Sequence, residues 1–361
     1  MAAKKILVAP LDWGLGHATR CIPLINLLIK KGANVEVGAN GPSYDLLKKE
    51  FPKLDFHTLP GMDIRYTKDG NFILQIMKQL PNISTSIKKE NNYLKKLIHL
   101  HKYDAVISDN RYGLHSDSVP CILITHQLML KAPSYLKFME RMLQKKLKDY
   151  IENFNYCWIP DWNGADSLSG DLANKFSLNI KINYLGPLSR FNELNESKEI
   201  DIDFDLLAII SGPEPQKSIF KEMIEEQARR KNISTLIIEG KPDNEDINIK
   251  NDGLIKKIAH ADSSFIKAAV EKSKGIIARS GYSTIMDLVA LCKNALLVPT
   301  PGQTEQEYLA SYLKKKNYFR FANQKSFDVT DAFFETNEYN FPQYSFEALN
   351  NAVDELWADL K

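Results

Sequence analysis

Long apolar runs, cysteine clusters and a strong net charge are all missing from this sequence of 361 residues. No stretch approaches the roughly 18 uninterrupted apolar residues that a membrane-spanning helix needs. The four cysteines are far apart and match no metal-ligand spacing, so we expect reduced thiols in a cytoplasmic protein and no bound metal. The first residues, MAAKKILVAP, read as a strand and lack a signal-peptide cleavage site.

The small net charge of +2 hides an uneven distribution. Residues 1–188 contain 25 Lys and Arg against 17 Asp and Glu, a charge of +8, and the remaining residues have 22 against 28, a charge of −6. A basic half indicates contact with something anionic, although charged helices also differ by chance. We expect no nucleic-acid partner.

What the sequence does contain is a regular alternation of strand-like and helix-like patterns. The strand-like runs are KKILVAP, NVEVGA, YDAVISD and CILIT, and, after the polar linker NELNESKEIDID, DLLAIIS, STLIIE, GIIA and ALLVP. Such alternation predicts parallel sheets with crossover helices, and ligands at the carboxyl ends of the strands. We therefore predict an α/β protein with Rossmann-like domains at 1–188 and 189–340, a ligand cleft between them, and a helix in 341–361 that packs back on the first domain.

Two glycines and a histidine follow the first strand, in VAPLDWGLGHATRC. Gly14 and Gly16 allow the backbone to approach a ligand closely, and the amides at the start of the next helix can face an anion. The dinucleotide-binding fingerprint is not met, because its third glycine position is Thr19. His17, at the mouth of the helix, is a candidate general base, although a lone histidine is more often structural.

Two more titratable side chains follow buried strands of the same half. Asp109 can hydrogen-bond the imidazole of His17 and fix its tautomer, or it can cap the following turn. His126, after CILIT, is a second candidate base.

The arrangement of Gly16 and His17 after a strand, Pro23 six residues beyond the histidine, and Lys-Gly before the next strand resembles the amino-terminal domain of GT-B glycosyltransferases. The resemblance implies that His17, paired with Asp109, activates an acceptor hydroxyl. The string GLGHATRC also resembles the pseudaminic-acid-pathway UDP-sugar hydrolase, in which the equivalent histidine activates water. LITHQL weakly resembles an acceptor-side motif of the peptidoglycan lipid-intermediate N-acetylglucosaminyltransferase family.

Residues from about 264 to 312 resemble the carboxyl-terminal domain of that same family, which is of the glycosyltransferase family 28 type. The helix amides there, with two hydroxyls, can hold a diphosphate without a metal. The resemblance implies that Ile266 backbone groups read uracil, that Asp287 binds the ribose diol, and that Glu305 and Gln306 contact the sugar. The full donor site that we expect comprises Ser211, Gly212, Phe265, Ile266, Arg279, Ser280, Gly281, Thr284, Asp287, Glu305 and Gln306.

Three departures from that family pattern leave parts of the donor site open. The ribose-binding glutamate is Asp287 here, and Glu307 stands for the second glutamine, so the donor sugar is undetermined. The phosphate loop ISGPEPQ contains two prolines, which leaves fewer amides free to donate. Phe265 is equally well explained by core packing.

Asp201-Ile-Asp203 resembles the manganese-binding D-x-D of another glycosyltransferase fold, but it lies in a linker and is read as solvated charge.

We predict a metal-independent glycosyltransferase of the hexosyltransferase type, without a cofactor, that moves a sugar from a UDP-sugar donor to a hydroxyl acceptor. Arg279, Ser280 and Thr284 are expected to stabilise the leaving diphosphate. Lysine-rich amphipathic segments at 88–98 and 136–148 favour an anionic or lipid-linked acceptor at the cytoplasmic membrane face, unless their apolar residues pack on the sheet. Two alternatives stay open: a UDP-sugar hydrolase, and a non-catalytic nucleotide-sugar-binding subunit of a membrane transferase.

Overall fold

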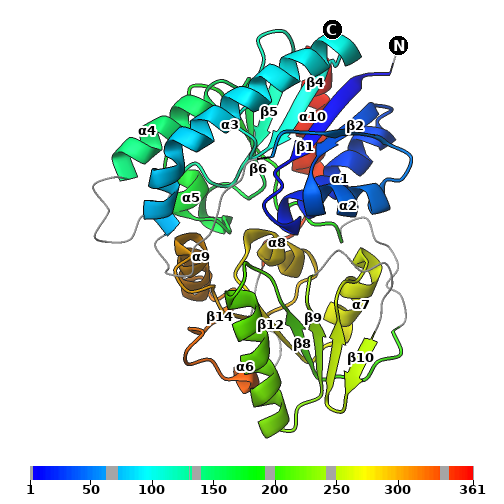
Figure 1. The fold of residues 1–361 in the computed structure, drawn as a ribbon, viewed down its shortest axis with the longest axis vertical. Helices are drawn as coiled ribbons and strands as arrows, with labels where there is room; N and C mark the ends of the chain where they lie inside the picture. The colour runs from blue at the N-terminus through cyan, green and yellow to red at the C-terminus, as the bar shows by residue number, and fades with distance from the viewer. Residues whose placement is uncertain are drawn as a thin grey trace. The chain divides into compact units, whose positions relative to one another are not determined.

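The computed structural model describes residues 3–61, 72–129, 131, 140–191, 200–240, 249–333 and 341–360. The chain divides into two compact units (Figure 1). Unit 1 comprises Met1–Arg65, Ile73–Ser189 and Gln343–Lys361, and unit 2 comprises Tyr66–Phe72 and Arg190–Pro342. Parts of the predicted linker and of the lysine-rich segment at 136–148 lie outside the described residues.

Unit 1 is built on a seven-stranded sheet of order β3-β2-β1-β4-β5-β6-β7, in which every pairing is parallel. Parallel strands need crossover connections, and the helices of this unit supply them. Its elements are β1 (Lys5–Pro10), α1 (Leu15–Lys30), β2 (Asn34–Ala39), α2 (Gly41–Glu50), β3 (Asp55–Thr58), α3 (Phe72–His101), β4 (Ala105–Asp109), β5 (Cys121–Ile124), α4 (Glu140–Ile151), β6 (Tyr156–Ile159), η2 (Gly164–Asp166), α5 (Asp171–Asn174), β7 (Lys181–Tyr184) and α10 (Glu347–Asp359).

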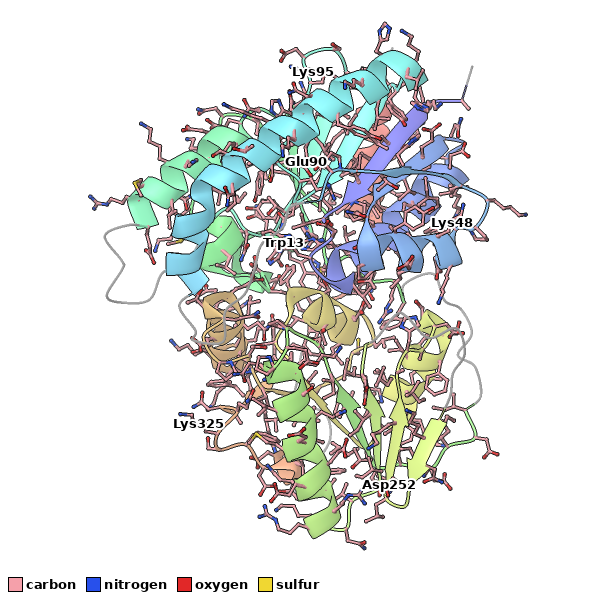
Figure 2. The ribbon with its side chains drawn as sticks, viewed as in Figure 1. Trp13, Lys48, Glu90, Lys95, Asp252 and Lys325 are labelled. Atoms are coloured by element: carbon pink, nitrogen blue, oxygen red, sulfur yellow. The ribbon has the colours of Figure 1, made fainter. Side chains whose placement is uncertain are left out.

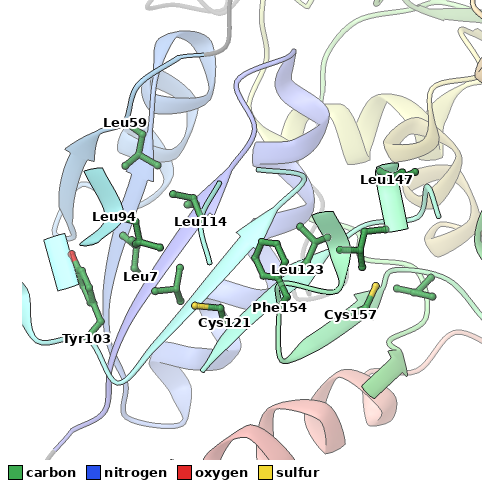
Figure 3. Close-up of a cluster of buried hydrophobic side chains, with 14 of the residues drawn as sticks. Leu7, Leu59, Leu94, Tyr103, Leu114, Cys121, Leu123, Leu147, Phe154 and Cys157 are labelled. Carbon is green, nitrogen blue, oxygen red and sulfur yellow. The ribbon is translucent and has the colours of Figure 1, made fainter. Parts of the chain in front are cut away.

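The core of unit 1 explains why its central strands read as uninterrupted apolar runs. One cluster of buried side chains joins Leu7 and Leu123 of the sheet to Leu94 of α3 and Leu147 of α4 (Figure 3). A parallel sheet is covered on both faces, so its strands are apolar on both sides. Burial of this apolar surface is the main force that holds the helices on the sheet.

Unit 2 has a second seven-stranded sheet, of order β10-β11-β9-β8-β12-β13-β14. Only β10 runs antiparallel to its neighbour, β11. The elements are β8 (Leu206–Ile209), α6 (Gln216–Arg230), β9 (Thr235–Ile238), β10 (Ile249–Asp252), β11 (Ile255–Ile258), α7 (Ser263–Lys272), β12 (Gly275–Ala278), α8 (Tyr282–Ala290), β13 (Leu296–Leu297), α9 (Thr304–Lys315), β14 (Arg320–Phe321) and η3 (Val329–Ala332).

The last helix, α10, packs on unit 1 although unit 2 precedes it in the sequence. Its inner face buries Leu349, Val353 and Leu356 almost completely. Polar contacts add to this packing, because Lys31, the C-cap residue of α1, pairs with Asp354 at 2.5 Å and Asn183 of β7 donates to Glu355 at 2.8 Å. The carboxyl-terminal segment is therefore an integral part of unit 1.

No helix in the described part of the chain is long and apolar enough to cross a membrane. The lysine-rich segment of α3 buries its apolar residues: Leu94 and Leu97 belong to the core cluster, and Tyr93 and Ile98 pack against it. Lys95 lies on the solvent side of this helix and Glu90 on its inner side (Figure 2). In α4, Leu147 is likewise in the core. Residues 136–139 of the second segment lie outside the described residues.

Candidate active site

His17 lies in the first turn of α1, directly after the loop that follows β1. Gly14 is the N-cap residue of this helix and has a φ of 83°, a left-handed conformation that favours glycine. No side chain caps the helix, and Gly16 is its second residue. Trp13 marks the loop in Figure 2. The loop therefore presents the start of α1, and His17 with it, at the carboxyl end of β1.

Asp109 is the last residue of β4, the strand next to β1, and its side chain contacts His17. His17 Nδ1 lies 2.8 Å from Asp109 Oδ1. The Asp109 side chain is 1% exposed and that of His17 is 16% exposed. The strand order places β4 beside β1, so the fold itself brings together two residues that are 92 positions apart. The predicted histidine–aspartate contact is present.

A third residue, Arg20, completes this group and was not anticipated from the sequence. Its buried guanidinium donates through Nε to Asp109 Oδ2 and through Nη2 to Asp109 Oδ1. Nη2 also lies 2.9 Å from His17 Nδ1. His17 and Arg20 are three residues apart on one helix, a spacing that places side chains on the same face. That spacing in GLGHATR is the signal from which Arg20 could have been found.

The charges of this group favour a neutral His17 with its lone pair on Nε2. Burial alone would raise the pKa of Asp109, but the positive charge of Arg20 and the hydrogen bonds from Arg20 and His17 outweigh it and lower this pKa to about 2. His17 Nδ1 contacts both the Asp109 carboxylate, which only accepts hydrogen bonds, and Arg20 Nη2, which only donates them. Because Arg20 Nη2 also donates to Asp109 Oδ1, we assign the ring proton to Nδ1, from which it is donated to Asp109. Burial first, and then the charge of Arg20, lower the pKa of His17 below its ordinary value, and Asp109 opposes them. His17 is therefore unprotonated at Nε2 near neutral pH.

His126, the second predicted base, lies two residues after β5 and contacts the same arginine. Arg20 Nη1 lies 3.3 Å from His126 Nδ1, and an arginine can only donate. His126 Nδ1 accepts in this contact. His126 is 5% exposed, whereas the His17 side chain is 16% exposed, so His126 is less open to a substrate than His17.

In unit 2, several of the expected donor-site residues lie in loops after β8, β12 and β13, which are consecutive in the sheet. Ser211 and Gly212 follow β8, and Gly212 has a φ of 101°. A Cβ on Gly212 would lie only 3.3 Å from Thr300 Oγ1, in the loop after β13. The Thr300 hydroxyl is buried and has no hydrogen-bond partner among the described residues. It was not among the predicted residues, and its position between two strand-end prolines was the only signal.

Ser280 and Gln306 brace these loops through their polar groups. Ser280 Oγ donates to the backbone oxygen of Gln306 at 2.8 Å, and the Thr300 amide donates to Gln306 Oε1 at 2.9 Å. The side-chain NH₂ of Gln306 is therefore the part that remains for a ligand. Glu305 precedes Gln306 in the first turn of α9 and is half-buried.

The placement of Arg279 disagrees with the expected role of stabilising the leaving diphosphate. Its guanidinium is fully buried and donates to the backbone oxygens of Val298 and Pro299, each at 3.1 Å, and of Gln216 at 2.9 Å. It also stacks on the Phe220 ring, 3.9 Å from the centroid. All of these acceptors are backbone groups of unit 2, so Arg279 anchors loops instead of stabilising a leaving diphosphate.

The predicted base-reading role of Ile266 also disagrees with the structure. The Ile266 amide donates to the Asp262 backbone oxygen at 3.0 Å, inside α7. The Phe265 amide donates to the Asp262 side chain, which caps the helix, at 2.7 Å. Both residues are buried, as core packing requires. Neither amide is free to recognise a base.

The remaining predicted residues lie at or near the start of α8. Gly281 is its N-cap residue, no side chain caps the helix, and Thr284 is in the first turn. Asp287 lies farther along the helix, where its carboxylate is 3.4 Å from Arg190 Nε, and both side chains are 14% exposed. A ribose diol at Asp287 would therefore meet an acceptor and a donor together. Asp203 of the D-x-D string is fully exposed, as expected of solvated charge.

Comparisons with known proteins agree with this architecture. Residues 209–338 match the model of the glycosyltransferase family 28 C-terminal domain. An uncharacterized glycosyltransferase of Methanosarcina mazei is 25% identical over 335 residues, which cover 88% of this chain and 85% of that protein. The resemblance of GLGHATRC to the pseudaminic-acid-pathway hydrolase finds no support in these matches.

Two solved structures show how far the fold is shared. The glycotransferase of kitacinnamycin superposes with a TM-score of 0.63 at 12% identity, covering 99% of this chain and 94% of that one. Arabidopsis thaliana UGT89C1, complexed with UDP-L-rhamnose, gives a TM-score of 0.56 at 12% identity, covering 92% and 88%. The predicted GT-B fold is confirmed. By its fold, its domain match and its relatives, the chain is a glycosyltransferase.

Proposed function

We propose that the protein transfers a sugar from a uridine diphosphate sugar to a hydroxyl acceptor, with His17 as general base. In this reaction His17 Nε2 takes the proton of the acceptor hydroxyl, whose oxygen attacks the anomeric carbon as the bond to the diphosphate breaks. The observation that carries the proposal is the hydrogen bond of 2.8 Å between His17 Nδ1 and a buried, ionised Asp109. It fixes the tautomer that leaves Nε2 as a base.

The donor side of the proposal rests on unit 2. The start of α8 has no side-chain cap and no acidic residue in its first turn, and such helix starts favour anions. The Thr300 hydroxyl has no hydrogen-bond partner among the described residues and lies beside Gly212, which has no side chain. This hydroxyl can donate to a phosphate oxygen. These groups support binding of the diphosphate without a metal ion.

Product analysis tests the proposal most directly. Purified protein is incubated with a panel of UDP-sugars, with and without hydroxyl acceptors, and the products are separated by chromatography. We expect a new glycoside only when an acceptor is present, at the same rate with and without a chelator. Release of free sugar and UDP without any acceptor would instead establish the hydrolase, in which water takes the place of the acceptor. Loss of turnover in a chelator, with recovery in manganese, would contradict the metal-independent mechanism.

The identity of the nucleobase in the donor is tested separately by thermal shift. A ligand that binds only the folded state raises its melting temperature by mass action. We expect UDP to raise it more than ADP at equal concentration, because UGT89C1, whose fold this chain shares, was solved with UDP-L-rhamnose. An equal shift by ADP would remove the uridine assignment and leave a nucleotide-sugar enzyme of another base.

The acceptor class is supported only by the charge of +8 on residues 1–188. We propose an anionic acceptor, free or lipid-linked. Because Leu94, Leu97 and Leu147 are in the core, these positions offer no apolar contact to a membrane. Sedimentation with anionic and with neutral vesicles at low salt distinguishes the two sources. Binding to anionic vesicles alone favours a lipid-linked acceptor, and no binding to either favours a free one.

A further inference from the structure

Three metal-ligating side chains meet in unit 1, outside the residues proposed for catalysis. Glu36 lies on β2, His57 on β3, and His101 is the last residue of α3. His57 Nε2 is 2.6 Å and His101 Nδ1 is 3.4 Å from Glu36 Oε2. One ligand atom from each of the three lies within 4.8 Å of the others.

The register of the sheet explains how these residues come together. Glu36 pairs with Leu7 of β1 and with Asp55 of β3. Side chains alternate between the faces of a strand, so Lys5, Glu36 and His57 point to one face. Leu7 of that face belongs to the core cluster with Leu94 and Leu97 of α3, which places the end of α3 over the same face. The three ligands therefore come from elements that the core already holds in place.

We propose that Glu36, His57 and His101 form a binding site for a divalent transition metal of the zinc type, with water as the fourth ligand. Two imidazoles and one carboxylate are a ligand set suited to zinc. Bonds of about 2.0–2.1 Å in a tetrahedron place ligand atoms roughly 3.3 Å apart. The separation between His101 and Glu36 matches this value, and that between His57 and Glu36 must widen when a metal binds.

The surroundings of Glu36 are those of a supported ligand. Lys5 Nζ lies 2.7 Å from Oε1, and the Tyr103 hydroxyl donates to Oε2 at 2.5 Å. Hydrogen bonds of this kind orient metal ligands. His57 and His101 are 16% and 24% exposed, which leaves a route for an ion.

The positive charge of Lys5 would repel a bound metal ion. Removing this charge therefore distinguishes a metal site from an ordinary ion-pair network. The Lys5 side chain is 26% exposed. Replacing it by methionine removes the repulsion and keeps most of the side-chain volume, so Lys5→Met should bind the metal more tightly. An ordinary ion-pair network predicts the opposite, namely loss of stability with no gain in metal binding.

The test uses the full-length, metal-stripped protein. Zn²⁺ is titrated by calorimetry and followed by thermal shift, and Co²⁺ is added for its visible absorption in tetrahedral coordination. We expect one equivalent bound, a raised melting temperature, and at least tenfold weaker binding in His57→Ala and in His101→Ala. His99→Ala is the matched control, because His99 is exposed on the same helix, and it should bind like the unaltered protein.

Circular dichroism of each metal-free variant shows that it is folded. If either variant does not fold, His57→Gln and His101→Gln replace it and are held to the same expectation. The absence of Zn²⁺ binding by the unaltered protein, or unchanged binding in the folded His57 and His101 variants, would overturn the proposal. The outcome does not depend on the transferase reaction, because no step of that reaction passes through these residues.

Discussion

Arg20 and His17 contact the same carboxylate, that of Asp109. In a histidine–aspartate pair without a third partner, the full negative charge of the carboxylate would favour a protonated imidazole. Here the guanidinium neutralises much of that charge, while the hydrogen bond still orients the ring. In the proposed mechanism Arg20 is therefore a positioning residue, because it lowers the pKa of His17 and keeps Nε2 of the ring unprotonated near neutral pH.

Replacing Arg20 by methionine is expected to shift the pH dependence of turnover. The pKa of His17 lies below its ordinary value, so the rate of the unaltered enzyme should fall only as the pH drops through that lowered value. Without Arg20, Asp109 acts unopposed and the pKa of His17 rises. The acidic limb of kcat/KM should therefore move to higher pH. Arg20→Lys, which keeps a positive charge, should move it less, and an unmoved limb in Arg20→Met would contradict the proposed role.

His17→Ala should lower kcat by roughly a hundred- to ten-thousand-fold, as expected for loss of a general base. UDP binding should change little, because the donor groups lie in unit 2. Asp109→Asn should lower kcat less, since the histidine remains but loses the charge that stabilises its protonated form. Steady-state kinetics together with a UDP thermal shift separate these effects. Near-normal turnover in His17→Ala would transfer the base role to His126 or to the substrate.

Thr300→Val tests the orphan hydroxyl. The hydroxyl has no partner among the described residues, so a side chain of the same shape should leave the free energy of unfolding nearly unchanged. If the hydroxyl binds the diphosphate, UDP affinity should fall by roughly five- to tenfold, about 1 kcal/mol. The matched control is Thr235→Val, because the buried Thr235 hydroxyl donates to the Ile233 backbone oxygen at 3.0 Å. That variant should lose stability and keep its UDP affinity.

Arg279→Ala should act on stability before it acts on chemistry. Three backbone oxygens that accept hydrogen bonds from Arg279 lose their donor in this variant. The contact with the Phe220 ring is lost as well. We expect a loss of about 3 kcal/mol in the free energy of unfolding, measured by urea denaturation. Arg229→Ala, in which a side chain 44% exposed is removed, should cost about 0.5 kcal/mol or less. If both variants lost the same small free energy of unfolding, Arg279 would again be a candidate for binding the diphosphate.

The central strands could be predicted because burial on both faces makes them apolar throughout. The edge strands could not, since DFHT, KINY and IKND are partly or fully exposed and carry no such signal. The ligand set Glu36, His57 and His101 was missed for a related reason. Its members are separated by 21 and 44 positions, and only the pairing of β2 with β3 and the end of α3 bring them together.

In the candidate site, the sequence located loops correctly but could not tell where side chains point. His17 and Asp109 were predictable because a helix start and a strand end fix both positions. Arg279 also follows a buried strand, yet its guanidinium turns inward to backbone oxygens, which no local pattern reveals. Ile266 was placed by resemblance, and the helix that begins at Ser263 uses its amide.

The docking of α10 on unit 1 bears on the order in which the protein folds. During synthesis the strands of unit 1 through β7 emerge first, but the helix that covers Lys31, Tyr156 and Asn183 emerges only after all of unit 2. Most of unit 2, from Arg190 to Pro342, is synthesised before the helix that completes unit 1. The apolar surface that Leu349, Val353 and Leu356 bury therefore stays uncovered until unit 2 has been synthesised, and over that interval it is open to chaperones.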